Sequence, residues 1–293
     1  MTRLVSLNDL SAFIEEIGVE SFMRQLVDRL DQDFRQWPSF QKSPRLVTHY
    51  PQGVMELMPV ANDDYYAYKF VNGHPGNTQH GKFCVVAMGM LAEVASGYPL
   101  LLCEMTLLTA FRTACTSALA AKYLVPSPVN AIGIIGTGTQ SEFQVLAHHF
   151  VLGCKDIYYY DIDPSAMDKF AANLLRFGLN LQPCANAREV VELSNAVITA
   201  TAAKKKAIII DNDWVRPGQY INAIGGDCQG KTELDPELLK RSTVVVEYLK
   251  QTEVEGEIQH GAETVYAELW EIMTNKKAAP HQKDSIVVFD SVG

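Results

Sequence analysis

The stretch Ala131–Glu142, which reads AIGIIGTGTQSE, decides the fold of this chain. Its first five residues are apolar and mostly β-branched, which is typical of a buried parallel strand. Gly136 and Gly138 follow at once, and helical spacing begins at Thr139. Glycine lets a backbone approach a ligand closely, and the free N–H groups at a helix N-terminus face an anion. The stretch therefore predicts a strand–turn–helix that binds a pyrophosphate.

A second strand strengthens this prediction. The pair of glycines is a weak signal alone, and Ser141 stands where the usual fingerprint has its third glycine. Ile157–Tyr160 reads as the next strand and is followed by Asp161, 20 residues beyond Ser141. An acid at this place can bind the ribose hydroxyls of a dinucleotide. The alternative is an ordinary strand–turn–helix followed by a chance acid.

From Val129 onward, predicted strands alternate with predicted helices. One helix carries its own boundary signals, with Asp163 as its cap, Pro164 at its first position and Gly178 beyond its end. Alternation of this kind predicts an α/β fold, a Rossmann-type doubly wound parallel sheet. The runs that predict strands are Ala131–Ile135, Ile157–Tyr160, Ala196–Thr199, Ala207–Ile210, Tyr220–Ile224, Val244–Tyr248 and Ile286–Phe289.

The first part of the chain has a different pattern. Ser6–Trp37 has helical spacing, and a strand-like period follows between Arg45 and Val71. Glu104–Leu124 predicts a long helix rich in small residues, which permit close packing either inside the fold or across a dimer. We therefore expect an N-terminal α+β domain over residues 1–124 and a Rossmann-type domain over residues 125–293.

Two charged residues lie in the strand-like part. Glu56 lies within Val54–Met58, a predicted strand that we expect Pro59 to end. A carboxylate with apolar neighbours on both sides indicates a specific task. Lys69 is expected on the same face of its strand as Val71, opposite the aromatic side chains. The default interpretation of a single lysine is a surface residue.

Composition limits the class of protein. A hydrophobic content of 47% in 293 residues is ample for about two globular domains. The net charge of −9 argues against a nucleic-acid or anionic-membrane surface, and Lys204–Lys206 is interpreted as a solvated loop. The N-terminus lacks the apolar region of a signal peptide. Glu104 interrupts the longest apolar run, so we expect no membrane-spanning segment.

The cysteines and histidines give no sign of a metal site. The six cysteines form no C-x-x-C pair and no evident disulfide framework, so we interpret them as reduced thiols in a cytoplasmic protein. His148 and His149 lie in the first predicted helix after the glycine turn. They are interpreted as packing or surface residues, and no metal is expected.

Candidate chemistry lies where the predicted strands end, because ligands of open α/β sheets bind beyond the carboxyl ends of the strands. Strand Tyr220–Ile224 runs into the sequence GGDCQGKTEL. Its Asp227 could accept a proton from a substrate ammonium group, or it could cap a helix that begins near Glu233. Cys228 is a candidate nucleophile, although burial is the commoner role of a lone cysteine.

Taken together, these motifs resemble the ornithine cyclodeaminase/μ-crystallin family over nearly the whole chain. INAIGGDCQGKTEL is the most specific block, because relatives that reduce ketimines or bind thyroid hormone typically lack its G-G-D-C form. The match therefore favours the cyclodeaminases of diamino acids. The matching blocks are Glu56–Pro59, Lys69–Pro75, Thr106–Lys122, Gly136–Gln140 and Ile221–Leu234.

The resemblance implies NAD-dependent cyclodeamination of L-ornithine to L-proline and ammonia. Hydride leaves Cα for NAD⁺, the δ-amine attacks the resulting imino acid, ammonia departs, and the cyclic imine takes the hydride back. Asp227 would handle the δ-amine proton, and Glu56 would lie near the α-amino group. The alternatives are a lysine cyclodeaminase, a ketimine reductase or amino-acid dehydrogenase of the same family, or a non-catalytic protein that binds nicotinamide cofactor and a small ligand.

The resemblance also implies binding residues. Arg45, Lys69 and Arg112 would hold the α-carboxylate, and Val292 would line the substrate. The Asp161 carboxylate would repel a 2′-phosphate and so favours NAD over NADP. The resemblance further implies a homodimer, with residues 1–124 as the substrate-binding and dimerisation domain and residues 125–293 as the NAD-binding domain. The implied cofactor-binding residues are Arg112, Thr139, Gln140, Asp161, Thr201, Asn222, Ala223, Ile224, Lys231 and Ser291.

The sequence departs from the family pattern in four places. Cys84 stands where a threonine usually meets the cofactor, and Gln229 replaces a usual proline. Glu253 reverses the charge of a common arginine. Relatives continue beyond the position of Gly293 into a helical segment that returns to the first domain. We therefore expect either a truncated chain or a protein that does without this segment.

Overall fold

A computed structural model of the protein describes residues 1–202, 207–260 and 265–292, so the Lys204–Lys206 run lies outside the described residues. The chain divides into two units. Unit 1 comprises Met1–Phe22 and Gln36–Arg112, and unit 2 comprises Met23–Arg35 and Thr113–Gly293. Each unit is built around a β-sheet of its own. The assignment of substrate binding to residues 1–124 and NAD binding to residues 125–293 stays a prediction.

Unit 1 contains a seven-stranded sheet in the order β1-β7-β6-β5-β4-β2, with β3 also paired to β4. Its neighbouring strands are antiparallel, except that β1 and β7 run parallel. Alternating polar and apolar residues produce this arrangement, because successive side chains of a strand point to opposite faces. The strands are β1 (Arg3–Val5), β2 (Gln41–Lys42), β3 (Leu46–Tyr50), β4 (Gly53–Ala61), β5 (Tyr65–Gly73), β6 (Ala87–Glu93) and β7 (Pro99–Glu104).

The N-terminal helical stretch forms two helices rather than one. The Ser6 hydroxyl caps α1 (Leu7–Ile17) by accepting a hydrogen bond from the Asp9 N–H. Gly18 follows with φ of 83°, a conformation that glycine adopts readily, and α2 (Val19–Arg35) begins after it. Short 3₁₀ helices lie at η1 (Trp37–Ser39) and η2 (Pro75–His80).

The prediction that Pro59 ends its strand is wrong. β4 continues through Pro59 to Ala61, and Pro59 lies opposite Tyr68 of β5. On the other side of β4, β3 pairs only as far as Leu57, and β2 pairs from Val60. Proline lacks an N–H, so it fits in a strand where one neighbour is missing. The gap between β3 and β2 provides that place.

Unit 2 contains an eight-stranded sheet in the order β10-β9-β8-β11-β12-β15-β13-β14, and every neighbouring pair is parallel. This confirms the predicted Rossmann-type sheet. The strands are β8 (Ile132–Ile135), β9 (Asp156–Tyr160), β10 (Asn180–Pro183), β11 (Ala196–Thr199), β12 (Tyr220–Ala223), β13 (Thr243–Val246), β14 (Val265–Glu268) and β15 (Val287–Asp290).

One predicted strand is wrong and two strands were not predicted. Ala207–Ile210 forms only an isolated bridge, between Ile210 and Leu234, and does not join the sheet. β10 and β14 lie at the two edges of the sheet. β10 reads NLQP and β14 reads VYAE, and neither has the continuous apolar run of a central strand.

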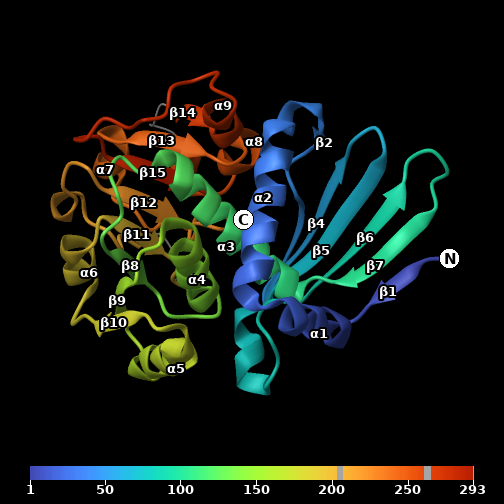
Figure 1. Ribbon diagram of the computed structural model, residues 1–293, viewed down its shortest axis with the longest axis horizontal. Helices are drawn as coiled ribbons and strands as arrows, with labels where there is room; N and C mark the ends of the chain where they lie inside the picture. Colours follow the sequence, from blue (N-terminus) through green and yellow to red (C-terminus); the bar gives the residue numbers. More distant parts are fainter. Residues whose placement is uncertain (203–206, 261–264, 293) are drawn as a thin grey trace. The chain divides into compact units, whose positions relative to one another are not determined.

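Helices cover both faces of the unit 2 sheet. Figure 1 shows α4 and α6 on opposite sides of β8. A Cβ on Gly133 would lie 2.6 Å from Val190 of α6, so glycine allows this helix to pack closely. Asp163 caps α5 as predicted, by accepting a hydrogen bond from the Ser165 N–H. The helices are α4 (Ser141–Leu152), α5 (Pro164–Leu174), α6 (Ala187–Leu193), α7 (Pro236–Lys240), α8 (Leu249–Thr252), α9 (Leu269–Met273), η3 (Leu175–Phe177), η4 (Asn212–Trp214) and η5 (Glu257–His260).

The predicted long helix is α3 (Thr106–Leu124). Its small residues Ala114, Ser117, Ala118, Ala120 and Ala121 are fully buried within the single chain. This supports the first of the two alternatives, close packing inside the fold. Over the part of the chain that the structure describes, neither α3 nor any other helix combines the length and apolar content needed to cross a membrane.

Candidate functional site

The predicted cofactor residues of unit 2 lie where its parallel strands end. Ile135, Tyr160, Thr199, Ala223 and Asp290 are in register across five strands. The residues that follow them therefore share one edge of the sheet. The chain proceeds from β8 to β9 on one side and returns to β11 on the other, which makes this edge a topological switch point. Ligands of open α/β sheets bind at such a point.

The glycine turn after β8 leaves room for a phosphate. Gly136 has φ of 96°, and a Cβ there would lie 2.6 Å from the Ala200 carbonyl oxygen, so only glycine fits. A Cβ on Gly138 would meet no atom within 4 Å, so the turn is open on that side. Gln140 precedes α4 without a side-chain hydrogen bond to cap it. Together these features suit an anion bound at the start of α4.

Ser141 occupies the place of the third glycine without leaving a polar group unpaired. Its side chain is fully buried, and its hydroxyl donates a 2.6 Å hydrogen bond to the Gly138 carbonyl oxygen. Thr139 is exposed and Gln140 is half-buried. The Gln140 side-chain oxygen is buried and has no hydrogen-bond partner among the described residues.

Asp161 is held against the glycine turn. Its Oδ2 accepts a 2.6 Å hydrogen bond from the Thr137 N–H and a longer one, of 3.2 Å, from the Thr137 hydroxyl. Its Oδ1 accepts a 3.0 Å hydrogen bond from the Asp163 N–H. The carboxylate therefore has a fixed place beside the predicted pyrophosphate site. Sequence reasoning missed Thr137, whose position between the glycines was its only signal.

Asp227 and Lys231 form an ion pair at the same edge of the sheet. The Lys231 Nζ lies 3.0 Å from Asp227 Oδ1 and donates a second 3.0 Å hydrogen bond to the Thr201 carbonyl oxygen. The Asp227 side chain is 56% exposed, whereas that of Lys231 is 8% exposed. The structure thus brings together Asp227, Lys231 and Thr201.

The structure rules out the helix-capping alternative for Asp227. No helix begins near Glu233 in this described part of the chain, and α7 begins at Pro236. The cap of α7 is Asp235, which accepts a hydrogen bond from the Glu237 N–H. The Asp227 carboxylate is therefore available for a role other than capping.

The remaining predicted residues of unit 2 are buried behind this edge. Asn222, Ala223 and Ile224 are at most 9% exposed, and both amide atoms of Asn222 lack a hydrogen-bond partner among the described residues. Ser291 is buried and donates a 2.7 Å hydrogen bond to Glu247 Oε2. Val292 is also buried. Buried amide atoms normally find partners, so Asn222 indicates a place for a partner that the described residues do not supply.

Three buried carboxyl groups support these loops, and sequence reasoning missed all three. Glu233 accepts hydrogen bonds from the N–H and hydroxyl of Thr201. Glu257 accepts hydrogen bonds from the N–H groups of Glu233 and Leu234, at 2.9–3.1 Å. Asp290 Oδ2 accepts hydrogen bonds from the N–H groups of Glu257 and Ile258, at 2.9 and 3.1 Å. No sequence spacing predicts these contacts, because the carboxyl groups come from a loop, a 3₁₀ helix and a strand that lie apart in the chain.

Burial changes the acidity of two of these groups. It raises the pKa of the Glu233 carboxyl, and the hydrogen bond from the Thr201 hydroxyl partly opposes this effect. It also raises the pKa of Glu257 well above its ordinary value, with the nearby Asp290 charge acting in the same direction.

Unit 1 holds its own set of predicted residues. The Arg45 Nη1 lies 3.2 Å from Glu56 Oε2, and both side chains are less than 10% exposed. Lys69 is 9% exposed, so the surface-lysine interpretation is wrong. Lys69 lies opposite Met58, which places it on the same sheet face as Glu56. Arg112, the last residue of the unit, is half-buried on α3.

The structure shows the surroundings of two residues that depart from the family pattern, Cys84 and Glu253. Cys84 is half-buried, and its thiol donates to the Pro75 carbonyl oxygen at 3.6 Å. Glu253 is exposed where α8 ends. Nothing in the structure explains the reversed charge at Glu253.

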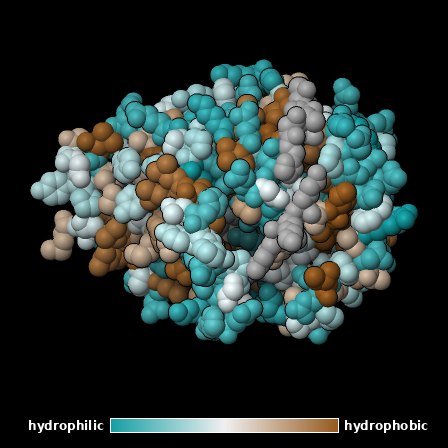
Figure 2. All heavy atoms as spheres, turned by 180° about the vertical axis from the view of Figure 1, so that it is seen from behind, coloured by the Kyte–Doolittle hydropathy of each residue, from teal (hydrophilic) through white to brown (hydrophobic). Residues whose placement is uncertain are grey.

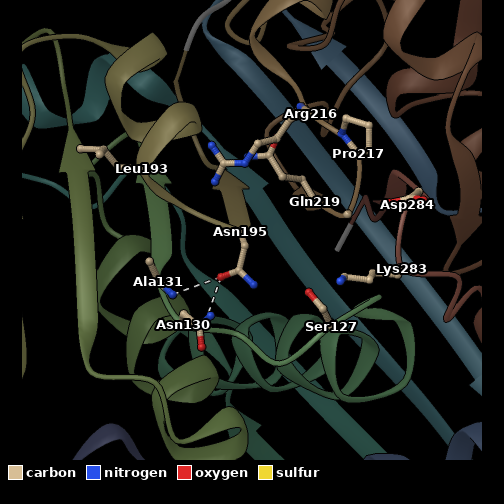
Figure 3. Close-up of a pocket in the computed structure, with 11 residues that line it drawn as sticks. Ser127, Asn130, Ala131, Leu193, Asn195, Arg216, Pro217, Gln219, Lys283 and Asp284 are labelled. Atoms are coloured by element: carbon tan, nitrogen blue, oxygen red, sulfur yellow. Dashed lines mark hydrogen bonds between the residues drawn. The ribbon is translucent and has the colours of Figure 1, made fainter.

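A separate hollow of about 340 Å³ lies at the amino ends of the unit 2 strands (Figure 3). Ala131, Asn195 and Gln219 in its lining each immediately precede a strand. Two of its polar side chains already have partners: the Asn195 Oδ1 accepts hydrogen bonds from the Asn130 and Ala131 N–H groups. The Arg216 guanidinium donates to the carbonyl oxygens of Glu192 and Ser194. The hollow is therefore at the opposite edge from the predicted site.

Known proteins match both the sequence and the fold. The model of the ornithine cyclodeaminase/mu-crystallin family matches residues 8–293. The ornithine cyclodeaminase of Brucella abortus biovar 1 (strain 9-941) is 46% identical over 290 residues, which is 99% of this chain and 81% of the relative.

Two solved structures share the fold at 28% sequence identity. One shows how lysine cyclodeaminase recognises L-lysine, L-ornithine and L-2,4-diaminobutyric acid; it has a TM-score of 0.92 and covers 100% of this chain and 88% of its own. The other is an archaeal alanine dehydrogenase dimer with bound NAD; it has a TM-score of 0.90 and covers 100% of this chain and 91% of its own. The chain belongs to the ornithine cyclodeaminase/μ-crystallin family, as the motifs of its sequence indicate.

Proposed function

We propose that this protein is an NAD-dependent ornithine cyclodeaminase, which converts L-ornithine into L-proline and ammonia. The observation that carries the proposal is the Asp227–Lys231 pair, which lies at the same sheet edge as the glycine turn of Gly136 and Gly138. This arrangement supplies a proton acceptor beside a dinucleotide site. The Brucella relative that is 46% identical to this chain over 290 residues carries the same name.

The residues of unit 2 fit NAD. The open side of Gly138 and the uncapped start of α4 suit the pyrophosphate, and the fixed Asp161 carboxylate suits the ribose hydroxyls. Bound NAD⁺ would accept a hydride from the substrate Cα and return it to the cyclic imine. The remaining proposed contacts come from Arg112, Thr139, Gln140, Thr201, Asn222, Ala223, Ile224, Lys231 and Ser291.

The residues of unit 1 suit an amino acid. Arg45, Lys69 and Arg112 would bind the α-carboxylate, and Glu56 would lie near the α-amino group. A guanidinium has five N–H donors, so Arg45 can bond a substrate carboxylate and Glu56 together. Lys69 is also buried, and its ammonium group can form a further ion pair with the carboxylate of an anionic substrate. Val292 would line the substrate.

Asp227 would handle the proton of the δ-amine. An amine attacks carbon only after it has lost its extra proton, so a carboxylate beside it promotes ring closure. The exposed Asp227 side chain is open to a ligand, and Lys231 keeps one of its oxygens in place.

We also propose a cytoplasmic homodimer. Leu46, Leu57, Phe70 and Met88 lie side by side across β3, β4, β5 and β6, on the sheet face opposite Lys69. Leu46 is 64% exposed and Met88 is 56% exposed, and Figure 2 shows hydrophobic residues at the surface of this unit. An apolar face of this kind favours association. The six free cysteines favour a reducing compartment.

The test is a reaction of the purified protein with L-ornithine and less than one equivalent of NAD⁺. Proline in excess of NAD⁺, one ammonia for each proline and no net NADH would support the proposal. Accumulating NADH would show a dehydrogenase instead, and a higher kcat/KM for L-lysine would show a lysine cyclodeaminase. NAD binding without any turnover would favour the non-catalytic alternative. Sedimentation of the same sample tests the dimer.

A further inference from the structure

Glu233 is a buried carboxyl group with an unusual setting. Its side chain is fully buried, and its Oε1 accepts hydrogen bonds from both the N–H, at 3.0 Å, and the hydroxyl of Thr201. Its Oε2 is buried and has no hydrogen-bond partner among the described residues. Burying a carboxyl group is expensive, so an apolar side chain would stabilise the fold better unless the carboxyl group has another role.

The loop before Asp227 is shaped around this carboxyl group. A Cβ on Gly225 would lie 1.9 Å from Glu233 Oε2 and 2.0 Å from its Cδ. Only glycine therefore lets the Glu233 carboxyl lie against the backbone two residues before Asp227. This contact gives a structural reason for the first glycine of the G-G-D-C sequence.

The contacts of Glu233 lead to Asp227 through two intermediate residues, Thr201 and Lys231. Glu233 holds the N–H and hydroxyl of Thr201, and the Thr201 carbonyl oxygen accepts a hydrogen bond from the Lys231 Nζ. The same Nζ pairs with Asp227. The Asp227 side chain is largely exposed, so its orientation depends on where the Lys231 ammonium group is held.

The other end of this network is anchored in the sheet. Glu257 holds the backbone N–H of Glu233, and Asp290 of β15 holds the backbone N–H of Glu257. Each link joins a carboxyl oxygen to a backbone N–H. Glu233 is thus positioned by a rigid element, as a positioning group must be.

We propose that Glu233 is a positioning residue for the proposed reaction: by fixing Thr201, it holds the Lys231 ammonium group where it orients Asp227. The inference rests on the proposed function for the role of Asp227, but the Glu233–Thr201–Lys231 network can be tested without turnover. A purely structural role for Glu233 predicts a loss of stability with no specific effect on Lys231 or on kcat.

The variants are Glu233→Ala, Glu233→Gln and Lys231→Met, with the double variant Glu233→Ala/Lys231→Met. Glutamine keeps one acceptor oxygen for Thr201, so it should restore most of what alanine loses. Gly225→Ala is a second way to displace the carboxyl group if Glu233→Ala folds poorly. Gln219→Ala is the control, because Gln219 is equally buried and binds two carbonyl oxygens at the amino edge of the same sheet.

The first readout is the rate at which an amine-reactive acetylating reagent modifies Lys231, followed by mass spectrometry. We expect Glu233→Ala and Gly225→Ala to raise this rate at least about fivefold, and Glu233→Gln and Gln219→Ala to leave it within about twofold. This result does not depend on the substrate. Unchanged labelling in Glu233→Ala would overturn the inference.

The second readout is steady-state kinetics per folded protein. Loss of a hydrogen bond that orients a charged group should lower kcat roughly tenfold or more in Glu233→Ala, with the KM for the amino acid nearly unchanged. The double variant should be no worse than the poorer single variant, because both changes break the same network. Additive losses, or a Glu233→Gln variant as slow as Glu233→Ala, would contradict the inference. Wild-type protein without ornithine turnover would refute the proposed function, and the labelling result would still decide the role of Glu233.

Discussion

Unit 1 and unit 2 present their charged side chains in different ways. In unit 1, Glu56 and Lys69 come from the middle of strands and are buried on a sheet face. In unit 2, Asp161 and Asp227 come from loops that follow strand ends, and Asp227 is largely exposed. Charged side chains on the sheet face of unit 1 are buried among other residues, whereas those at the sheet edge of unit 2 lie among loops and solvent.

Because of this difference, substitutions in the two units should change different properties of the protein. A buried ion pair loses stability when one partner is removed, because the other charge stays buried and unpaired. An exposed carboxylate contributes little to stability, so its removal should chiefly change the rate of the reaction. We therefore expect substitutions of the buried charges in unit 1 to change stability. Substitutions at the sheet edge of unit 2 where the parallel strands end should change activity or the affinity for a ligand.

The largest expected effect is on the activity of Asp227→Ala. Loss of a general base lowers turnover by at least about a hundredfold, while NAD binding stays intact. Turnover of L-ornithine and a fluorescence titration with NAD⁺ measure the two quantities. Cys228→Ser is the matched control beside it and should keep normal turnover. Near-normal turnover in Asp227→Ala would contradict the proposed role of Asp227 as the proton acceptor.

The next effect is on the stability of Arg45→Met. This change leaves Glu56 buried without the Arg45 charge and should lower the free energy of unfolding by about 3 kcal/mol. Urea denaturation measures it. The control is Arg188→Ala, whose exposed ion pair with Glu192 should contribute less than about 0.5 kcal/mol. Equal effects of the two substitutions would contradict the contrast between the buried and exposed pairs.

His148 should make the stability of unit 2 depend on pH. Burial lowers the pKa of His148 to about 4, and its Nδ1 donates to the Gln144 carbonyl oxygen. Between pH 6.5 and 4 the unfolded chain binds a proton that the folded chain does not, so stability falls as the pH falls through this range. The loss should reach no more than about 3 kcal/mol.

Thermal unfolding of His148→Leu at several pH values tests this prediction. Wild type should lose stability relative to the variant from pH 7 to pH 4, since leucine binds no proton. A parallel pH dependence in wild type and His148→Leu would show that His148 does not titrate in this way.

The smallest effect is expected for Asp161→Ala. Removal of a carboxylate that binds the ribose hydroxyls should weaken NAD⁺ binding roughly tenfold and reduce the preference over NADP⁺. Calorimetric titration with both cofactors measures the change. Asp163→Ala removes a nearby carboxylate that only caps α5, so it should alter stability by about 1 kcal/mol and leave the preference unchanged. An unchanged preference in Asp161→Ala would contradict the assigned contact.

The sequence predicted the parallel sheet well because its central strands have distinctive patterns. β11 matches the predicted Ala196–Thr199 in full, since a strand buried on both faces reads as a continuous apolar run. The edge strands β10 and β14 were missed because they lack such runs. Pro59 was misread because its tolerance depends on whether a neighbouring strand pairs there, which is a property of the whole sheet.

By itself the sequence determined the Rossmann-type fold, the family and the residue types of the predicted site. These follow from local patterns: the period of apolar residues, the glycine turn and the G-G-D-C block. Only the tertiary structure decided that Lys69 is buried, that Asp227 pairs with Lys231, and that Glu233 holds Thr201. The Glu233–Thr201 contact joins two separate loops, the burial of Lys69 depends on its neighbouring strands, and the Asp227–Lys231 pair depends on how a single loop folds back on itself. Such contacts are set by how the strands align and how the loops pack, and no spacing along the chain encodes them.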